Sequence, residues 1–528
     1  MTSPVNNAIF RLPKRAESSA RPKLIQTFVD IGPLFSLLSG VDHQILYGRR
    51  GTGKTHVLNY LADSRENVGD AVVVTDLRNI GSSAGLYADT SIALPERATR
   101  LLVDTLLSIH SSLYEFFVEL SEELDLSQSG PALDRLADAI TEVKVVGNIE
   151  KVDAKSHSRE QKIAKRFALS ASAKPSLTIN DDNQNSQTES EQATVSRSGH
   201  EQLYVNFGAT GYAFREIVSC LQGRHLWVLL DEWSSIPLEL QPYLADLIRR
   251  SLFSIQGITV KIAAIEHRSN LMINKGRGDY IGIETGADAS ADVNLDDFMV
   301  FDNDSVKSQE FFQELLGQHI LAAAKDMGIE DSLPKTPSLI INEAFTEKRA
   351  LEEFVRACEG VPRDGINIIS LAAQKAIDNK ISVYHVRVAA NTWYQRDKER
   401  AVSSNPIAGD LLHWIIDTVI GERKARAFLL KADENSNIID SLYDSRVLHV
   451  LKRSVSSRDE PGVRYDVFKL DYGCYVNLLS TSKAPQGLLP LDDEEIAQYI
   501  DVPPDDYRSI RRAILNLEDF KTSNALDY

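Results

Sequence analysis

The sequence predicts an α/β fold with a central parallel sheet, followed by a helical lid and a winged-helix-like C-terminal domain. The run Gly48–Thr55 reads G-x-x-x-x-G-K-T and directly follows the apolar stretch 43–47. A second apolar run, 225–230, is long enough for a strand buried on both faces and ends in Asp231. Strand and helix patterns alternate between and after these runs, as in a parallel α/β sheet.

The glycine-rich run has the residues that a phosphate-binding loop requires. Its glycines let backbone N–H groups turn toward an anion, Lys54 reaches the outer phosphates, and the Thr55 hydroxyl can bind Mg²⁺. The sequence therefore predicts a nucleoside triphosphate site for ATP with Mg²⁺. The residues expected to contact the nucleotide are Gly48, Arg49, Arg50, Gly51, Thr52, Gly53, Lys54, Thr55 and His56.

The acidic end of the second run supplies the other half of such a site. In P-loop ATPases one acid at this position holds the magnesium ion and a second polarises the attacking water. Asp231 is therefore expected to bind Mg²⁺ together with Thr55, and Glu232 is expected to act as the catalytic base. A glycine turn or an acidic strand end without a ligand is the alternative, but the two motifs together favour the ATP site.

Composition narrows the class of protein. The chain has 528 residues, enough for two to four domains, with 58 basic and 75 acidic side chains and a formal charge of −17. Any nucleic-acid contact must therefore come from a local basic surface. The three cysteines are far apart without metal-ligand spacing, which predicts buried thiols in a reducing compartment. The polar, basic start and the lack of a run of about 18 apolar residues predict a cytoplasmic protein without membrane contact.

Further core elements follow from periodicity. Strands are expected over 71–76 and 258–265, with a further strand over 298–301, and helices over about 95–124, 212–222 and 240–253. Residues from about 150 to 200 are polar and contain few large apolar side chains. Such a segment is expected to be a mobile insertion, since it cannot bury enough surface to offset its ordering entropy; a partner-binding loop is the alternative.

These patterns divide the chain into successive parts. We expect a flexible N-terminal segment (1–24), an ATPase core (25–305), a helical lid (306–403), a winged-helix-like domain (404–480) and a C-terminal helical tail (481–528).

The motifs together resemble those of AAA+ ATPases. The P-loop, the Leu-Leu-Asp-Glu strand end, the strand ending Ala264-Ile265-Glu266-His267-Arg268 and the lid sequence Gly360-Val361-Pro362-Arg363 carry this resemblance. Within AAA+ proteins the chain is most similar to the bacterial relatives of origin-recognition and cell-division-cycle (ORC/Cdc-type) initiators. The segments 231–237 and 76–87 carry that narrower similarity, which covers roughly residues 25–400 without the insertion.

The resemblance implies roles for further residues. Arg363 matches a sensor-2 arginine that contacts the γ-phosphate and couples the lid to nucleotide state; an arginine that only caps or pairs on a helix is the alternative. The sensor-1 position offers Glu266, His267 and Arg268 and stays unassigned. An arginine finger acting on a neighbouring subunit, and hence ATP-dependent self-assembly, is also implied. Its candidates, each of which could instead be a solvated structural arginine, are Arg249, Arg250, Arg268 and Arg277.

The C-terminal domain shows the order helix, strand, helix and two-stranded hairpin. A helix is expected from 411, a strand over 427–430, a second helix over 437–443, and hairpin strands over 447–451 and 465–470. This order suggests a winged helix, which initiator ATPases carry in the same place. The second helix carries Asp440 and Asp444 against Arg446, whereas a DNA-reading helix normally has a clear positive face. The hairpin's basic residues could contact DNA phosphates, but a protein-docking winged helix is an equal alternative; these residues are Lys452, Arg453, Arg458 and Arg464.

Three classes of function remain. The first is an ATP-hydrolysing regulator that couples its nucleotide state to DNA or partner engagement, with catalysis by Glu232, Lys54 and Arg363. The second is a switch ATPase that controls a partner effector protein, for example in anti-phage defence, without contacting DNA. The third is a nucleotide-binding scaffold that scarcely hydrolyses ATP. Salt-dependent DNA affinity would separate the first class from the second.

Overall fold

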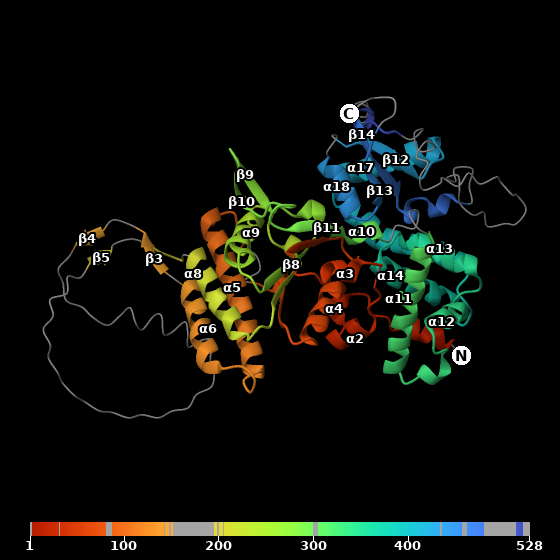
Figure 1. Cartoon of the computed structure of the whole chain (residues 1–528). Helices are drawn as coiled ribbons and strands as arrows, with labels where there is room; N and C mark the ends of the chain where they lie inside the picture. The colour runs from red at the N-terminus through yellow and green to blue at the C-terminus, as the bar shows by residue number, and fades with distance from the viewer. Residues whose placement is uncertain are drawn as a thin grey trace, which may run out of the picture.

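A five-stranded parallel sheet forms the centre of the protein in the computed structural model (Figure 1). The structure describes residues 3–30, 32–80, 87–141, 143–146, 149–151, 195–197, 200–203, 205–298, 305–432, 436–456, 462–479 and 514–520. Every strand pair in this sheet is parallel. In spatial order the strands are β11 (Ser290–Asn294), β1 (Gln44–Tyr47), β8 (Ile258–Ala264), β7 (Leu226–Asp231) and β2 (Ala71–Asp76).

The strand order brings the two nucleotide motifs to one edge of the sheet. Strand β1 ends at the P-loop and β7 ends at Asp231, with β8 hydrogen-bonded between them. Both strands run in the same direction, so their carboxyl ends open on the same crevice, where ligands bind in open α/β sheets. The predicted fold class, a P-loop parallel sheet with a helical lid, is therefore confirmed.

One expected strand lies almost wholly outside the described residues. The fifth strand is β11, and the predicted strand over 298–301 begins inside α10 (Leu295–Phe298), while 299–301 lie outside the described residues. Strand β11 pairs only with β1, at the edge of the sheet. Its sequence, Ser290–Asn294, contains only Ala291 and Val293 as apolar residues, so it gave a weaker signal than the apolar run after it.

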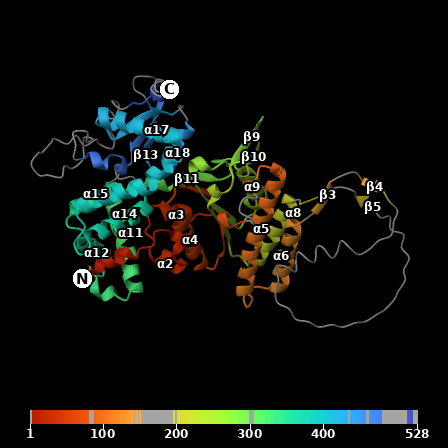
Figure 2. The same cartoon turned by 180° about the vertical axis from the view of Figure 1, so that it is seen from behind.

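A helical bundle covers one end of the sheet (Figures 1 and 2). Its side chains form one hydrophobic core with the inner faces of β2, β7 and β8. The helices are α5 (Leu94–Glu119), α6 (Leu126–Ile140), α8 (Phe207–Cys220), α9 (Gln241–Ile248) and its π-helical continuation η4 (Arg249–Phe253).

Helix α5 differs from one expectation. It is long and apolar enough to cross a membrane when judged by length and composition alone, and it is the only such helix in the described ranges. However, Leu101, Leu106, Ile109 and Leu113 are almost fully buried in the bundle core. A core helix of a soluble protein gives the same signal, so α5 is explained by its packing.

The insertion begins and ends as a two-stranded ribbon. Strand β3 (Val143–Val146) pairs antiparallel with β6 (His200–Leu203), and β4 (Ile149–Lys151) pairs with β5 (Val195–Arg197). The remaining insertion, 152–194, lies outside the described residues, so its predicted mobility stays a prediction.

A short hairpin and several short helices complete the core. Strands β9 (Met272–Gly276) and β10 (Asp279–Gly282) form the hairpin, which extends away from the core (Figures 1 and 2). The helices are α2 (Arg21–Gln26), α3 (Leu34–Leu38), α4 (Lys54–Glu66), and the single turns η2 (Leu77–Asn79), η3 (Trp233–Ser235) and η5 (Glu266–Arg268).

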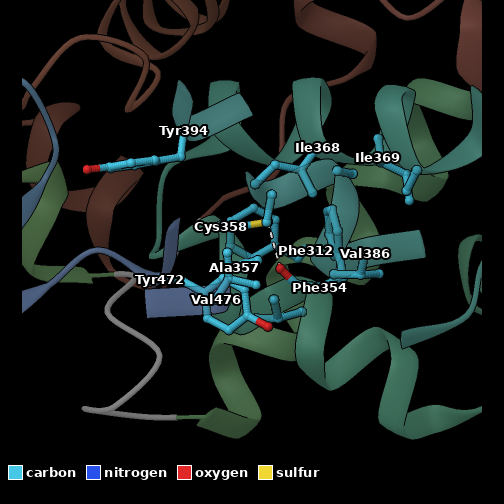
Figure 3. Packing of buried hydrophobic residues seen from close by; sticks show 14 of the residues in the cluster. Phe312, Phe354, Ala357, Cys358, Ile368, Ile369, Val386, Tyr394, Tyr472 and Val476 are labelled. Carbon is cyan, nitrogen blue, oxygen red and sulfur yellow. Dashed lines mark hydrogen bonds between the residues drawn. The ribbon is translucent and has the colours of Figure 1, made fainter. Parts of the chain in front are cut away.

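The lid lies at the opposite end of the molecule from the bundle (Figures 1 and 2). Figure 3 shows Phe312 and Phe354 packed near Cys358, with their ring centroids 6.1 Å apart. The lid elements are α11 (Ser305–Asp326), η6 (Glu330–Ser332), α12 (Pro337–Ala344), α13 (Lys348–Cys358), α14 (Pro362–Ala376), α15 (Val383–Trp393), the π-helix η7 (Tyr394–Lys398) and α16 (Glu399–Ser403).

The C-terminal domain has the predicted order of elements. Its antiparallel sheet has the order β12-β14-β13. Tyr472 and Val476 enter the same hydrophobic cluster as the lid helices (Figure 3), so the two parts share a core. The elements are α17 (Pro406–Ile415), the π-helix η8 (Ile416–Glu422), β12 (Ala427–Lys431), α18 (Asn437–Asp444), β13 (Leu448–Ser456), β14 (Arg464–Leu470), α19 (Tyr472–Tyr475) and η9 (Val476–Leu478).

The N-terminal segment is packed against the lid, which corrects the expectation of a flexible stretch over 1–24. Helix α1 (Pro4–Phe10) buries Val5, Ala8 and Ile9 completely, and Asn6 donates to the carbonyl of Ile377 at 2.8 Å. The apolar residues have helical spacing, so they form a stripe that the lid core covers. A single turn, η1 (Ala16–Ser18), then leads toward α2.

All three cysteines are free thiols. Cys358 is buried, whereas Cys220 and Cys474 are half-buried, so the expectation of buried thiols holds fully for Cys358 only. Burial raises the pKa of the Cys358 thiol well above its ordinary value, which keeps it protonated and unreactive.

Candidate functional site

The P-loop links β1 to α4 with the backbone that its sequence predicts. Helix α4 begins at Lys54, and the preceding residue Gly53 has φ +105°, a left-handed conformation that side chains rarely adopt. Gly51 has φ +90°, and a Cβ atom on it would lie 2.6 Å from the Cβ of Arg363. The glycines therefore give the loop its turn and let the lid approach it closely.

Thr55 and Asp231 lie in direct contact at the start of α4. The Thr55 hydroxyl donates to Asp231 Oδ2 at 2.6 Å, and the backbone N–H of Glu232 donates to Oδ1 at 2.8 Å. Burial raises the pKa of Asp231, while these two hydrogen bonds act in the opposite direction. A hydroxyl and a carboxylate beside phosphate oxygens are the oxygen ligands that Mg²⁺ takes in nucleotide sites, so this pair fits the predicted metal.

No group of three or more His, Cys, Asp or Glu side chains suited to hold a metal occurs within the described parts of the chain. A metal at Thr55 and Asp231 would therefore complete its shell with phosphate and water oxygens, the usual arrangement for Mg²⁺.

Glu232 sits in a constrained backbone conformation beside the metal ligands. Its φ of +57° lies in the left-handed region, which is uncommon for residues other than glycine and is found at functional sites. One Glu232 carboxylate oxygen lies 3.8 Å from a guanidinium nitrogen of Arg78, which itself is held by Asp76 at 2.7 Å. Arg78 was given no role from the sequence, although it follows the end of β2 directly.

Lys54 turns its ammonium group onto the loop itself. Its Nζ donates to the carbonyl of Gly48 at 2.7 Å and to that of Arg49 at 3.1 Å. Burial lowers the pKa of Lys54, and the nearby carboxylates of Asp231 and Glu232 oppose this effect. The lysine thus stands where phosphate oxygens could replace the two carbonyls.

Arg363 begins α14 next to the loop. Its backbone N–H donates to the carbonyl of Gly51 at 3.2 Å, and its side chain forms no ion pair with any carboxylate in the described ranges. Burial and the positive charge of Arg446 lower the pKa of Arg363. The nearby carboxylate of Glu17 offsets only part of this charge, so a half-buried cation beside a phosphate-binding loop is suited to receive an anion.

Lys54, Thr55, Glu232 and Arg363 line one cavity of about 260 Å³, whereas Asp231 is not among its lining residues. The N-terminal segment closes one side of it, because Glu17 forms an ion pair with Arg78 at 2.9 Å and Arg15 also lines the cavity. This contribution was missed in the sequence, where 1–24 was expected to be flexible. The residues that line the cavity include Lys14, Arg15, Glu17, Leu24, Arg50, Gly51, Gly53, Lys54, Thr55, His56, Arg78, Glu232, His319 and Arg363.

Three residues of the predicted contact set, Gly48, Arg49 and Thr52, do not line the cavity. His56 lines the cavity, with its Nε2 against the carbonyl of Leu24. Arg49 turns its side chain away from the cavity: it is 3% exposed and its Nε donates to Asp296 at 2.7 Å. The backbone N–H of Arg49 donates to Asp296 at 2.8 Å and its carbonyl accepts from Lys54 Nζ at 3.1 Å, so the structure does not place Arg49 in the cavity.

The four candidates for an arginine finger differ in whether they form ion pairs within the described structure. Arg249 and Arg250 each pair with Asp246 at 2.8 Å, and Arg268 pairs with Asp444 at 2.9 Å. Arg277 lies exposed at the turn of the β9–β10 hairpin, and no ion pair involving it occurs in the described structure.

The sensor-1 position is occupied by contacts with the C-terminal domain. His267 lies 3.7 Å from both Asp440 and Asp444 of α18, and Glu266 pairs with Arg453 of β13 at 2.9 Å. Helix α18, the expected recognition helix, therefore turns its acidic side chains toward the ATPase core.

Comparisons with known proteins add little to this geometry. No protein-family model matches the chain, and no curated protein matches it in sequence. Among solved structures, one match is the Aeropyrum pernix ORC1 protein in complex with DNA, at 11% identity and a TM-score of 0.30, covering 85% of this chain and 93% of that chain. A likeness at that TM-score carries no argument, so the assignment below rests on the sequence motifs and the site.

Proposed function

We propose that this protein binds ATP with Mg²⁺ and hydrolyses it as a switch ATPase similar to AAA+ proteins of the ORC/Cdc type. The contact between Thr55 and Asp231, 2.6 Å across the start of α4, carries the proposal. Two residues 176 positions apart in sequence meet where P-loop ATPases hold their metal. Lys54, Glu232 and Arg363 line the cavity beside them.

The side chains divide the chemical work. Lys54 and Arg363 supply positive charge for the outer phosphates, and backbone N–H groups of the loop hold the inner ones. Glu232 accepts a proton from, and orients, the attacking water. Bound Mg²⁺ would neutralise phosphate charge as it develops. We propose the nucleotide itself as the substrate.

The output of the switch is proposed to be the C-terminal domain, which lies against the ATPase core. A protein partner is favoured as its target, because α18 carries acidic residues and these face the core. DNA binding is the second candidate, supported by Lys452, Arg453 and Arg464 on the β13–β14 hairpin. We also propose that the protein is cytoplasmic and that it self-assembles when ATP is bound. Its protein partner is proposed to be an effector, for example in a defence system.

Calorimetric titration of the full chain with ATP, with and without Mg²⁺, tests ATP binding. A phosphate-release assay tests ATP hydrolysis. The proposal requires binding that Mg²⁺ strengthens and a measurable turnover. No heat of binding at millimolar ATP would reject the nucleotide site, whereas binding without turnover would leave the non-hydrolysing scaffold.

A further inference from the structure

Two buried arginines, one from the P-loop and one from the C-terminal domain, link these two parts of the protein. Arg49 of the P-loop donates to the carbonyl of Leu448 at 2.9 Å and lies 4.4 Å from the ring centroid of Tyr443. Arg446 of the C-terminal domain donates in return to the carbonyl of Arg50 at 3.1 Å. The P-loop arginine thus contacts backbone and aromatic groups of the C-terminal domain, and the C-terminal arginine contacts the backbone of the P-loop. Both arginines are nearly fully buried.

The second arginine also reaches the lid. Arg446 lies 3.6 Å from the carboxylate of Asp364, and Lys398 of the lid pairs with the same carboxylate at 2.9 Å. Asp364 directly follows Arg363 at the start of α14. Arg446 therefore contacts both the P-loop and Asp364, the residue next to Arg363, which is the arginine proposed to bind the γ-phosphate.

The contacts close into a ring. Lys398 pairs with Asp471 at 2.5 Å, Asp471 lies 3.0 Å from Nε2 of His449, and Nδ1 of His449 lies 3.1 Å from Arg49. Burial and the charge of Arg49 lower the pKa of His449 to about 4, so its ring is neutral. A neutral ring can donate from Nε2 to Asp471 and accept at Nδ1 from Arg49, which matches both neighbours.

Such a ring gives the C-terminal domain a fixed position. Buried charges are costly unless paired, and the loss of one partner leaves the others uncompensated. The docked C-terminal domain therefore adds contacts to both the P-loop and the start of α14, which are also joined directly by the hydrogen bond from Arg363 N–H to the carbonyl of Gly51.

We propose that Arg446 is a positioning residue of the nucleotide site, so that the C-terminal domain completes that site from outside the ATPase core. The inference rests on the proposed ATP function and adds a part to it. Lys54 at present donates to the carbonyls of Gly48 and Arg49. A bound triphosphate draws Lys54 toward the phosphates. The loop segment that Arg49 and Arg446 contact then loses its two hydrogen bonds from Lys54.

Coupling of this kind works in both directions. If nucleotide changes the docking of the C-terminal domain, then displacement of that domain changes nucleotide affinity by the same factor. A partner that binds the face of α18 or β13 now turned to the core would therefore alter ATP binding without touching the cavity.

The test compares Arg446→Met, Arg446→Lys and a control, Arg400→Met, at an exposed arginine of α16. ATP affinity, kcat and KM are measured separately, together with hydrogen exchange of α18 and β13 with and without ATP. For Arg446→Met we expect kcat/KM to fall about tenfold and the ATP-induced change in exchange of α18 and β13 to disappear. Arg446→Lys should restore part of both, because it keeps the charge beside Asp364, and the control should match the wild type.

Wild-type kinetics and an ATP-dependent exchange change in Arg446→Met would overturn the inference. Absence of ATP binding by the wild-type chain would instead reject the proposed function, so the two failures are distinct. If Arg446→Met does not fold, Asp397→Asn decides the question. Asp397 pairs with Arg446 from a 39% exposed position, so this variant is mild, and an unchanged exchange response in it would also overturn the inference.

Discussion

Thr55 on the P-loop helix and Asp231 at the end of β7 share a hydrogen bond of 2.6 Å, and this contact joins the two nucleotide motifs. Burial raises the pKa of Asp231, and this hydrogen bond acts to lower it. The bond also holds the Asp231 carboxylate beside the start of α4. Lys54 is the neighbouring residue, so the same turn of helix carries both the hydroxyl proposed to bind Mg²⁺ and the ammonium group proposed to bind the outer phosphates.

Lys54→Ala should remove most of the affinity for triphosphate, by about 100-fold, because the outer phosphates lose the cation of the loop. The backbone cradle remains, so the fold should be retained. Titration with a fluorescent ATP analogue measures the loss, with Lys275→Ala on the exposed hairpin as the matched control. Equal affinity of Lys54→Ala and the control would show that the P-loop is not the nucleotide site.

Glu232→Gln should bind ATP normally and hydrolyse it about 100-fold more slowly, because the amide keeps the shape of the side chain but cannot accept the proton of the attacking water. The ATP-bound form should then accumulate. If an arginine of one subunit completes the site of the next, this form should also have a larger mass in light scattering with ATP than without. An unchanged mass would reject ATP-driven self-assembly and favour a monomeric switch.

The sequence predicted the parts of the fold that depend on local patterns. Strands β2, β7 and β8 are continuous apolar runs, and the P-loop has a fixed spacing, so both were found at the right positions. Strand β11 was missed because its five residues contain only two apolar side chains, Ala291 and Val293. Helix α1 has helical apolar spacing, but only the lid that covers it shows that the segment is ordered.

Long-range contacts were beyond the reach of the sequence. Arg49 was expected at the nucleotide because it lies inside the loop motif, and nothing local indicates that its side chain points to His449, 400 positions later. The acidic face of α18 was noted, but its partners on η5 follow only from how the domains meet. Motif chemistry is local, whereas the direction of a buried side chain depends on tertiary packing.

Arg277→Ala should abolish ATP-dependent assembly and lower turnover, if a finger acts between subunits, since Arg277 is the exposed candidate at a projecting hairpin. Arg249→Ala is the comparison, because that arginine is bound to Asp246 at 2.8 Å within its own subunit. Turnover should then rise with protein concentration in the wild type but not in Arg277→Ala. Identical, concentration-independent rates in both would remove Arg277 from the mechanism.

DNA affinity should be weak and should fall steeply with salt, because a net charge of −17 opposes approach and α18 is turned inward. Charge reversal at Lys452 and Arg453 should weaken it further. Fluorescence anisotropy with a labelled duplex over a salt series measures both effects, with reversal of the exposed Lys348 in the lid as control. Tight binding that survives the reversals at Lys452 and Arg453 would place the DNA surface elsewhere.

Docking of α18 should depend on pH through His267. Burial opposes charge on this ring, but the carboxylates of Asp444 and Asp440, each 3.7 Å away, and of Glu266 outweigh it and raise the pKa above the ordinary 6.5. A raised pKa means that the charged ring stabilises the folded state below about pH 6.5, and that this contribution is lost as pH rises through the raised value.

The free energy of urea unfolding of wild type and His267→Gln should therefore differ more at about pH 6 than at about pH 8, by up to about 1 kcal/mol because the ring is partly exposed. Arg268 and the Tyr443 ring also face His267, but neither changes charge in this range. His413→Gln, at an exposed histidine of α17, should show no such difference between the two pH values. If the gap for His267→Gln were the same at both, His267 would not titrate at this contact, and the ion pair of Arg268 with Asp444 would be the charged contact between η5 and α18.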